Sequence, residues 1–262
     1  MSTTSSADGT TIGYEAVGSG PTLLLVDGAT ASRAGGSASR LADALSGDVT
    51  AVAYDRRGRG ESTDTLPFAV EREIEDIDAL IAAVGAPAYA FGMSSGAMLL
   101  LRAAAALGPE RIAGIVLYEP PLMPEGARDG ARQYTADLAA ALAEGRRGDA
   151  VALFLARVGM PPAAIDGMRG SPAWAGLEAI APTLAYDDAA MGDSAVPSEV
   201  VAEVRIPVLT LAGGASAGFM QYGARELAAA IPGAVFEVAE GQTHDVAPDV
   251  AAAHITRFLH SV

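Results

Sequence analysis

Short apolar runs alternate with longer segments of mixed apolar and polar residues along most of the chain. The short runs have the composition of buried β-strands, and the mixed segments repeat apolar residues at the spacing of amphipathic helices. This alternation predicts an α/β fold, in which helices cover both faces of a mostly parallel sheet. We predict strands over residues 11–17, 22–26, 50–54, 88–91, 114–118, 208–212 and 234–239. We predict helices over residues 39–45, 70–84, 97–107, 222–230 and 248–259.

The strand pattern disappears between residues 120 and 204, where helical segments dominate. These segments cover residues 127–144, 149–158, 162–168 and 173–186. An insertion of this size after one strand, with the sheet resuming at 208, predicts a helical cap over the edge of the sheet that carries the site. We expect residues 1–119 and 205–262 to form the core domain and residues 120–204 the cap. A separate domain is the alternative, although both ends of the insertion return to the same sheet.

A Gly-x-Ser-x-Gly motif with Ser94 at its centre joins the predicted strand 88–91 to the predicted helix 97–107. In such a setting the tight turn exposes the serine hydroxyl, and its neighbours two residues away on each side must be small. The start of the helix also directs backbone N–H groups towards the hydroxyl, where an oxyanion would develop. The motif therefore predicts a serine nucleophile at Ser94.

The same motif occurs a second time at residues 214–218, with Ser216 at its centre. Only Ser94 is followed at once by a long apolar run, which is typical of a helix buried against a sheet. Ser94 also leaves most of the chain downstream for a catalytic acid and base. We therefore favour Ser94 over Ser216.

The chain contains three histidines, and histidine has an unperturbed pKa that suits a base for a serine nucleophile. His254 and His260 follow the polar and apolar pattern of the last predicted helix, where a surface or packing role is the better interpretation. His244 lies between the last predicted strand and that helix. Its loop would open at the carboxyl edge of the sheet, where catalytic groups gather in such folds. We predict that His244 is the base.

The order of Ser94 and His244, together with the sheet pattern, resembles the α/β-hydrolase superfamily. Residues 55–62, Asp-Arg-Arg-Gly-Arg-Gly-Glu-Ser, resemble the family's Asp-x-Arg-Gly-x-Gly-x-Ser turn, which precedes the nucleophile. The likeness covers almost the whole chain and is greatest to compact bacterial hydrolases with a short helical cap. It implies a serine, acid, histidine order along the chain. We interpret the charged residues 55–57 themselves as a turn held by charge-assisted hydrogen bonds.

The loop that forms the oxyanion hole in this family often begins with His-Gly, whereas here it reads Asp27-Gly28-Ala29. The missing histidine is not expected to matter, because the donor is a backbone amide. The resemblance thus implies an oxyanion hole formed by the backbone N–H groups of Ala29 and Ser95.

The position of the acid that orients the histidine departs from the usual family pattern. Most members carry it in a Gly-x-x-Asp turn after the next-to-last strand, but here that turn ends at Ser216. Some members, including haloalkane dehalogenases, take the acid from the loop after the preceding strand, where this chain has Glu119. We assign Glu119 to the triad, and its alternative role is to anchor the cap. Asp245 would diverge from its neighbour His244, and Asp27 is a weaker candidate.

The cap and the motif also supply candidates for a substrate pocket. Side chains that face Ser94 would form an adaptable apolar pocket, although most apolar cap residues should simply pack the cap helices. The candidates are Met93, Met123, Phe154 and Trp174. Such a pocket suits a small to medium apolar substrate.

Composition narrows the range of partners. The 32 acidic residues outnumber the 17 basic ones, and the net charge of −15 opposes binding to nucleic acid or anionic lipid. No apolar stretch approaches the roughly 18 residues that span a bilayer, and the polar N-terminus does not resemble a signal peptide. The absence of cysteine excludes disulfides and thiolate metal sites. We expect a cytoplasmic monomer or homodimer that acts on a small molecule without a metal or organic cofactor.

Taken with the resemblance, these observations predict a serine hydrolase, a carboxylesterase or lactonase, that works through an acyl-enzyme. The unusual acid position keeps a second hypothesis open, namely a cofactor-free lyase, C–C hydrolase or cyclase on the same fold. A third hypothesis is a noncatalytic receptor that retains Ser94 and His244 to bind its ligand. Enzymes with an aspartate nucleophile are disfavoured, because the motif carries serine.

Overall fold

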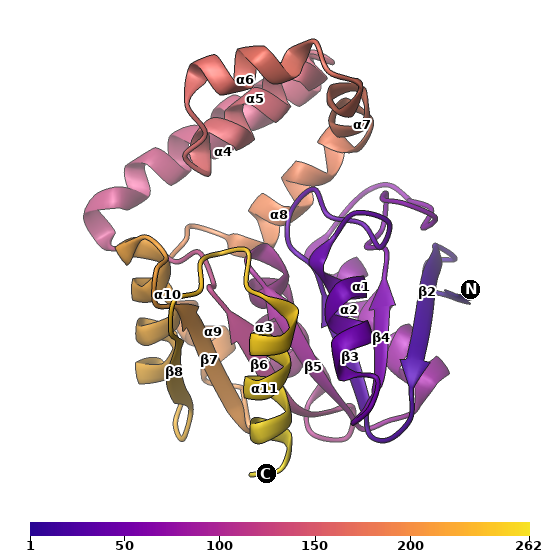
Figure 1. Cartoon of the computed structure of the whole chain (residues 1–262). Coiled ribbons are helices and arrows are strands. Elements are labelled where there is room, and N and C mark those ends of the chain that lie inside the picture. The colour runs from indigo at the N-terminus through magenta and orange to yellow at the C-terminus, as the bar shows by residue number, and fades with distance from the viewer.

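The computed structural model describes residues 1–262 and contains one central sheet (Figure 1). Its strand order is β1-β2-β4-β3-β5-β6-β7-β8. The strands are β1 (Ser2–Ser5), β2 (Thr11–Gly18), β3 (Thr22–Val26), β4 (Thr50–Tyr54), β5 (Ala88–Met93), β6 (Ile112–Tyr118), β7 (Val208–Gly213) and β8 (Val235–Ala239). Strand β2 runs antiparallel to both β1 and β4, and all other pairs are parallel. The predicted α/β fold is confirmed.

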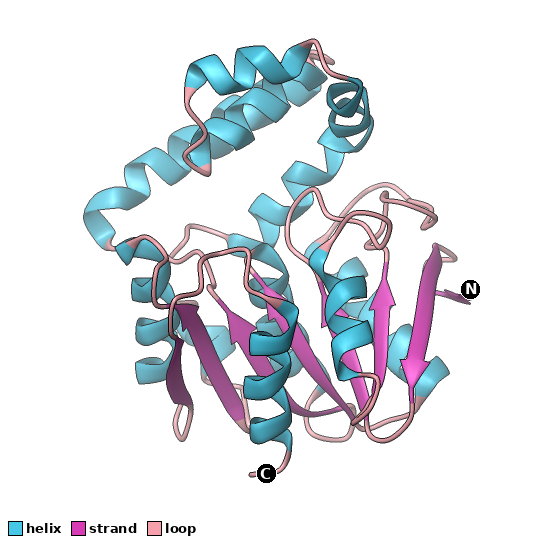
Figure 2. Ribbon diagram, in the orientation of Figure 1, coloured by secondary structure: helices cyan, strands magenta, loops and turns pink.

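Helices pack against both faces of this sheet, as Figure 2 shows. The helices are α1 (Ser37–Leu45), α2 (Val70–Val84), α3 (Ser95–Leu107), α4 (Arg128–Ala143), α5 (Arg147–Arg157), α6 (Pro162–Arg169), α7 (Pro172–Ile180), α8 (Leu184–Met191), α9 (Ser198–Val201), α10 (Gly218–Ala230) and α11 (Pro248–Leu259). Two short 3-10 helices, η1 (Glu125–Ala127) and η2 (Ala181–Thr183), precede α4 and α8. None of the helices is long and apolar enough to cross a membrane.

Strand β3 shows how the sheet divides the core into two layers. Leu23 and Leu25 belong to a buried cluster with α1 and α11, whereas Leu24 and Val26 belong to a second cluster with α2 and α3. Successive side chains of a strand point to opposite faces, so a strand covered on both faces needs apolar residues at every position. This explains why the strands read as continuous apolar runs.

The chain between β6 and β7 leaves the sheet and forms helices α4 to α9. Helices α4 to α7 lie above the carboxyl ends of the strands, and α8 descends towards the sheet (Figure 1). Tyr134, Leu138, Val151 and Trp174 form part of a small apolar cluster of their own in this region, so α4 to α7 pack chiefly on one another, whereas Ala190 of α8 packs in the cluster with α2 and α3. We call α4 to α8 the inserted helices.

Apart from shifts in bounds, such as α10 beginning at Gly218 rather than at 222, the elements differ from the sequence-based prediction in three places. The helix predicted over residues 173–186 is two helices, α7 and α8, joined by η2. Pro182 lies in this joint, and proline cannot donate the backbone hydrogen bond that a continuous helix needs. Strand β1 was not predicted because its side chains are mostly exposed and leave no apolar pattern. Helix α9 lies inside the predicted cap range, but its Val201 packs in the cluster with α2 and α3.

Candidate active site

Ser94 occupies the sharp turn between β5 and α3. Its backbone angles, φ 56° and ψ −125°, are strained for a residue with a side chain and cost roughly 1–3 kcal/mol. Small neighbours permit the turn. A Cβ atom on Gly92 would lie 2.7 Å from the carbonyl oxygen of Gly96, and one on Gly96 would lie 2.4 Å from that of Val26. Ser216, in the second motif, does not share the positive φ.

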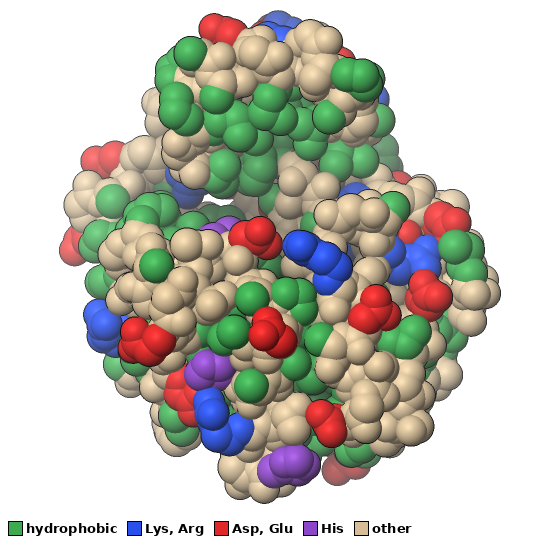
Figure 3. All heavy atoms as spheres, viewed as in Figure 1, with side chains coloured by type: hydrophobic (Ala, Val, Ile, Leu, Met, Phe, Trp, Pro, Cys, Tyr) green, Lys and Arg blue, Asp and Glu red, His purple; other side chains and the backbone are tan.

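A cavity of about 160 Å³ opens beside Ser94, between the carboxyl edge of the sheet and the inserted helices. Figure 3 shows this cavity as a hollow below the inserted helices, which form the upper part of the view. Hydrophobic side chains gather on the side of these helices that faces the hollow. Ala29, Ser95 and His244 also line the cavity on the side of the sheet. The structure thus brings four predicted site residues to one space. A wider groove between α1 and α11 contains none of them.

Of the four pocket candidates, Met123 and Phe154 line this cavity, and Met93 and Trp174 do not. Met93 packs instead against the cluster on the α1 and α11 face. Trp174 lies within the small cluster of the inserted helices, where the guanidinium of Arg169 stacks 5.0 Å from its ring. Both side chains therefore pack in apolar clusters and do not line the cavity beside Ser94.

Glu119 and His244 lie next to each other although 125 residues separate them in the chain. Oε2 of Glu119 is 2.6 Å from Nδ1 of His244, and its Oε1 accepts a hydrogen bond of 2.8 Å from the backbone N–H of Gly213. Glu119 has a positive φ of 46° and follows β6 directly. The hydroxyl of Tyr118 donates to the carbonyl of Thr243, which holds the histidine loop against the same strand end.

The Glu119 side chain is completely buried. Burial alone would raise the pKa of its carboxyl, but hydrogen bonds from His244 and the backbone of Gly213 outweigh this and hold the pKa below its ordinary value. The buried Ser216 hydroxyl adds a polar contact without full hydrogen-bond geometry. Glu119 is therefore a carboxylate at neutral pH and can only accept hydrogen bonds. Its partner Nδ1 must then carry a proton, which leaves Nε2 of His244 unprotonated in the neutral ring.

The other candidate acids face elsewhere. The side chain of Asp245 is 80% exposed and pairs with Arg40 at the surface. Asp27 accepts hydrogen bonds from the Ser37 hydroxyl and the Ala38 N–H, so it caps the start of α1. Neither carboxylate contacts His244.

The two remaining histidines lie away from the cavity. His254 pairs with Glu237 through Nδ1, with 2.6 Å between the nitrogen and Oε2, and His260 is exposed just beyond α11. The interpretation of these residues as surface or packing groups agrees with their positions.

Two backbone N–H groups near Ser94 have no acceptor within the chain. Ser95 is the first residue of α3 and so has no intrahelical acceptor for its N–H. The N–H of Ala29 makes no hydrogen bond with another group of the protein. The preceding residue approaches Ser94 closely, since a Cβ atom on Gly28 would lie 3.1 Å from the Cβ of Ser94. Glycine therefore allows this loop to reach the serine.

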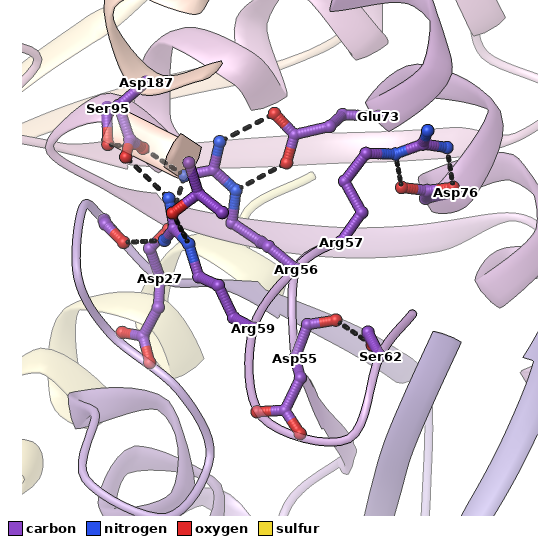
Figure 4. A network of polar contacts seen from close by, with 12 residues as sticks. Asp27, Asp55, Arg56, Arg57, Arg59, Ser62, Glu73, Asp76, Ser95 and Asp187 are labelled. Carbon is purple, nitrogen blue, oxygen red and sulfur yellow. Dashed lines mark hydrogen bonds and ion pairs between the residues drawn. The ribbon is translucent and has the colours of Figure 1, made fainter. Parts of the chain in front are cut away.

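A buried cluster of charges contacts Ser95 and the loop after β3 (Figure 4). Arg56 and Arg59 each form an ion pair of 2.6 Å with Asp187 of α8. Asp187 also accepts a hydrogen bond of 2.8 Å from the hydroxyl of Ser95, and Arg56 pairs with Glu73 of α2 over 2.7 Å. All four charged side chains are at most 5% exposed. Two positive and two negative charges thus balance one another in the interior.

The same cluster is joined to the loop after β3. Arg59 donates to the carbonyl of Gly28 over 2.8 Å, and Arg56 donates to that of Asp27 over 3.4 Å. Burial disfavours the charge on Asp187, but its attraction to Arg59 and Arg56 is stronger, so its pKa lies below the ordinary range. Asp187 is therefore ionised at neutral pH. It links α8 directly to Ser95, at the start of α3, and through Arg59 to the loop after β3 that carries Ala29.

Comparison with known proteins assigns this architecture to a family. A profile of the alpha/beta hydrolase family matches residues 23–253. The chain belongs to this family. An alpha/beta hydrolase from Sphaerobacter thermophilus DSM 20745 has a solved structure with 46% identity to this hydrolase and a TM-score of 0.88, covering 98% of this chain and 100% of that one. A hydrolase from Pseudomonas aeruginosa PA01, with 24% identity, a TM-score of 0.74 and coverage of 98% and 97%, shows the fold alone.

Among curated proteins, the uncharacterized hydrolase YraK of Bacillus subtilis (strain 168) is 36% identical over 122 residues. That alignment spans 44% of this chain and 43% of the Bacillus protein. The matched part is thus less than half of that relative's length.

Sequence reasoning about this hydrolase missed Asp187. The residues at 55–57 were interpreted as a turn, and Asp55 does accept hydrogen bonds from the N–H groups of Arg33 and Glu61 there. Arg56 instead points inward and meets a carboxylate 131 residues further along the chain. The signal in the sequence that could have indicated a buried acid is the group of arginines at 56, 57 and 59, directly after the apolar run 50–54. Arginines buried next to such a strand need acidic partners that are also buried.

Replacing Asp187 by Asn should destabilise the protein by about 3–5 kcal/mol, because it leaves buried arginine charge without its partner. Asp188→Asn is the matched control, since Asp188 is the next residue and forms no ion pair. Urea denaturation of both variants at pH 7 measures the difference. Equal stabilities of the two variants would contradict this account of the cluster.

The destabilisation caused by Asp187→Asn should also depend on pH. The folded pKa of Asp187 is lowered, so its contribution is complete above the unfolded pKa of about 3.9 and is lost as the pH falls through the folded pKa. The stability difference between wild type and Asp187→Asn should therefore shrink when the same denaturation is repeated in acid.

Proposed function

We propose that this hydrolase is a serine hydrolase, a carboxylesterase or lactonase, that cleaves a small ester through an acyl-enzyme. The observation that carries the proposal is that His244, paired with the buried Glu119, lines one cavity with a serine on a strained turn. A serine, a base and a buried acid at one sheet edge are the parts that nucleophilic acyl transfer needs.

In the proposed acylation, Oγ of Ser94 attacks the carbonyl carbon of the ester while Nε2 of His244 takes the hydroxyl proton. The negative charge that forms on the carbonyl oxygen is accepted by the N–H groups of Ala29 and Ser95, which have no other acceptor. The positive end of the α3 dipole favours the same charge. His244 then gives its proton to the departing alcohol, and the acyl group stays on Ser94.

In the proposed deacylation, His244 removes a proton from water, and the resulting nucleophile attacks the acyl carbon. Collapse of the second tetrahedral intermediate releases the acid and returns the proton to Ser94. Glu119 stabilises the imidazolium at both stages, because its ionised carboxylate is held 2.6 Å from Nδ1. Burial of this carboxylate away from water strengthens that attraction.

The cavity supports a small substrate. A cavity of about 150 Å³ accommodates a molecule of the size of benzene, and this cavity measures about 160 Å³. Met123 and Phe154 belong to its mostly apolar lining, which favours a short apolar segment next to the reacting carbonyl. We therefore propose acyl chains of a few carbon atoms.

Stopped-flow hydrolysis of p-nitrophenyl esters from acetate to octanoate tests the acyl-enzyme. We expect wild type to release a burst of p-nitrophenol close to one equivalent with the shorter esters, and Ser94→Ala to show none. The dependence on chain length reports the usable depth of the cavity. Folded wild-type protein that gives no burst and is not labelled by a fluorophosphonate would contradict the proposed hydrolase, and would favour a lyase, a cyclase or a receptor.

Glu119→Gln should lower kcat by about 10⁴-fold, because an orienting amide cannot stabilise the imidazolium as a carboxylate does. Ser216→Ala is the matched control, since Ser216 also lies against Glu119 but has no proposed chemical step. Steady-state kinetics of the two variants on p-nitrophenyl acetate, with circular dichroism to verify folding, gives the comparison. A larger loss in Ser216→Ala than in Glu119→Gln would refute the assignment.

A further inference from the structure

One wall of the cavity carries charge that the proposed mechanism does not use. The inserted helices contribute Tyr134 from α4, Arg157 from α5 and Asp188 from α8 to this wall. Arg157 is the only arginine that lines the cavity. The same cavity holds Ser94 and His244, so a ligand that reaches the nucleophile also lies close to this wall.

Arg157 has unused hydrogen-bonding capacity. Its guanidinium lies over the ring of Tyr134, with Cζ 4.9 Å from the ring centroid, and one nitrogen donates to the Ser194 hydroxyl over 3.4 Å. It takes part in no ion pair, although the chain has 32 acidic residues for 17 arginine charges. A guanidinium has five N–H donors in its plane. The contact with the ring and the single hydrogen bond to Ser194 leave most of these donors free.

The arrangement suits an anionic group with two oxygens. A guanidinium binds a carboxylate through two parallel hydrogen bonds in its own plane. Contact with the aromatic ring of Tyr134 restricts the motion of the guanidinium, which lowers the entropy lost on binding. The half-buried position of Arg157 strengthens the attraction relative to a fully solvated arginine.

Asp188 makes this wall selective. It lines the same cavity but is not paired with Arg157. Burial raises the pKa of Asp188, and the nearby Asp187 acts in the same direction, whereas Thr135 and Arg157 lower it. A substrate carboxylate would therefore be attracted at Arg157 and repelled at Asp188, so its position would be defined.

We propose that Arg157 binds a carboxylate of the substrate, so that the substrate is a small ester or lactone that also carries a free carboxylate. This inference rests on the proposed hydrolase function and names its substrate class. Ser94 and Arg157 line the same cavity of about 160 Å³. A substrate that reaches both residues would therefore carry its ester and its carboxylate at the two ends of a short chain. A half-ester of a short dicarboxylic acid has this form.

The test uses pairs of substrates that differ in charge and little in size. Monomethyl and dimethyl esters of succinate, glutarate and adipate are hydrolysed at pH 7, and the release of acid is followed by titration. The measured quantity is the ratio of kcat/KM for the monoester to that for the diester. We expect wild type to prefer one of the monoesters by tenfold or more, and the preferred length reports the spacing between Arg157 and Ser94.

Three variants test whether Arg157 causes the preference for monoesters. Arg157→Gln should reduce the ratio at least tenfold, and Asp188→Asn should increase it, because a repelling charge is removed. Arg147→Gln is the matched control, since Arg147 is exposed at the other end of α5 and outside the cavity. It changes the net charge equally and should leave the ratio unchanged. An equal ratio in wild type and Arg157→Gln, or an equal loss in both arginine variants, would overturn the proposal.

A binding measurement separates this proposal from the proposed reaction. Calorimetric titration of the Ser94→Ala variant with glutarate needs no turnover, and we expect saturable binding that Ser94→Ala/Arg157→Gln loses. Binding without cleavage of any ester would retain the anion site and reject the hydrolase. Ester cleavage with no charge preference, and without glutarate binding, would retain the hydrolase and reject the anion site.

Discussion

The buried ion pairs of Asp187 with Arg56 and Arg59 connect the parts of the structure that must act together. Asp187 belongs to the inserted helices, the arginines follow β4, and their other hydrogen bonds reach the loop after β3 and the start of α3. Each charge would be costly alone in the interior. The cluster is therefore satisfied only when these four segments are in place, and this arrangement fixes both backbone N–H groups beside Ser94.

Strain and burial act together at the same edge of the sheet. Ser94 and Glu119 both follow strands directly and both have positive φ angles, which are unfavourable for residues with side chains. Packing of the strands on both faces holds these conformations. The result is that a hydroxyl faces the cavity, while a carboxylate is buried behind the histidine where its charge is least screened. The contact of Glu119 with His244 is the one that the proposed mechanism needs, although the usual turn for the acid carries Ser216.

Much of this architecture could be predicted from local pattern, and the rest depends on long-range contacts. Strands such as Thr22–Val26 and the helix Pro248–Leu259 match their predicted bounds, because apolar periodicity reflects packing against a sheet. The exposed β1 lacks such a pattern, and Pro182 breaks a helix that periodicity alone would continue. The proximity of Glu119 to His244 was predictable from two strand ends, but the partnership of Arg56 with Asp187 was not, since nothing local identifies which acid pairs with a buried arginine.

The rate at which a fluorophosphonate labels Ser94 in folded Asp187→Asn protein, relative to wild type, tests most directly whether the charge cluster prepares the serine and its amides for reaction. Mass spectrometry of the intact protein gives this rate, with Ser94→Ala as the unlabelled reference. We expect labelling to be slower by about tenfold or more, because misalignment of donors in the proposed oxyanion hole has effects of at least this size. Labelling of the folded variant at the wild-type rate would contradict it.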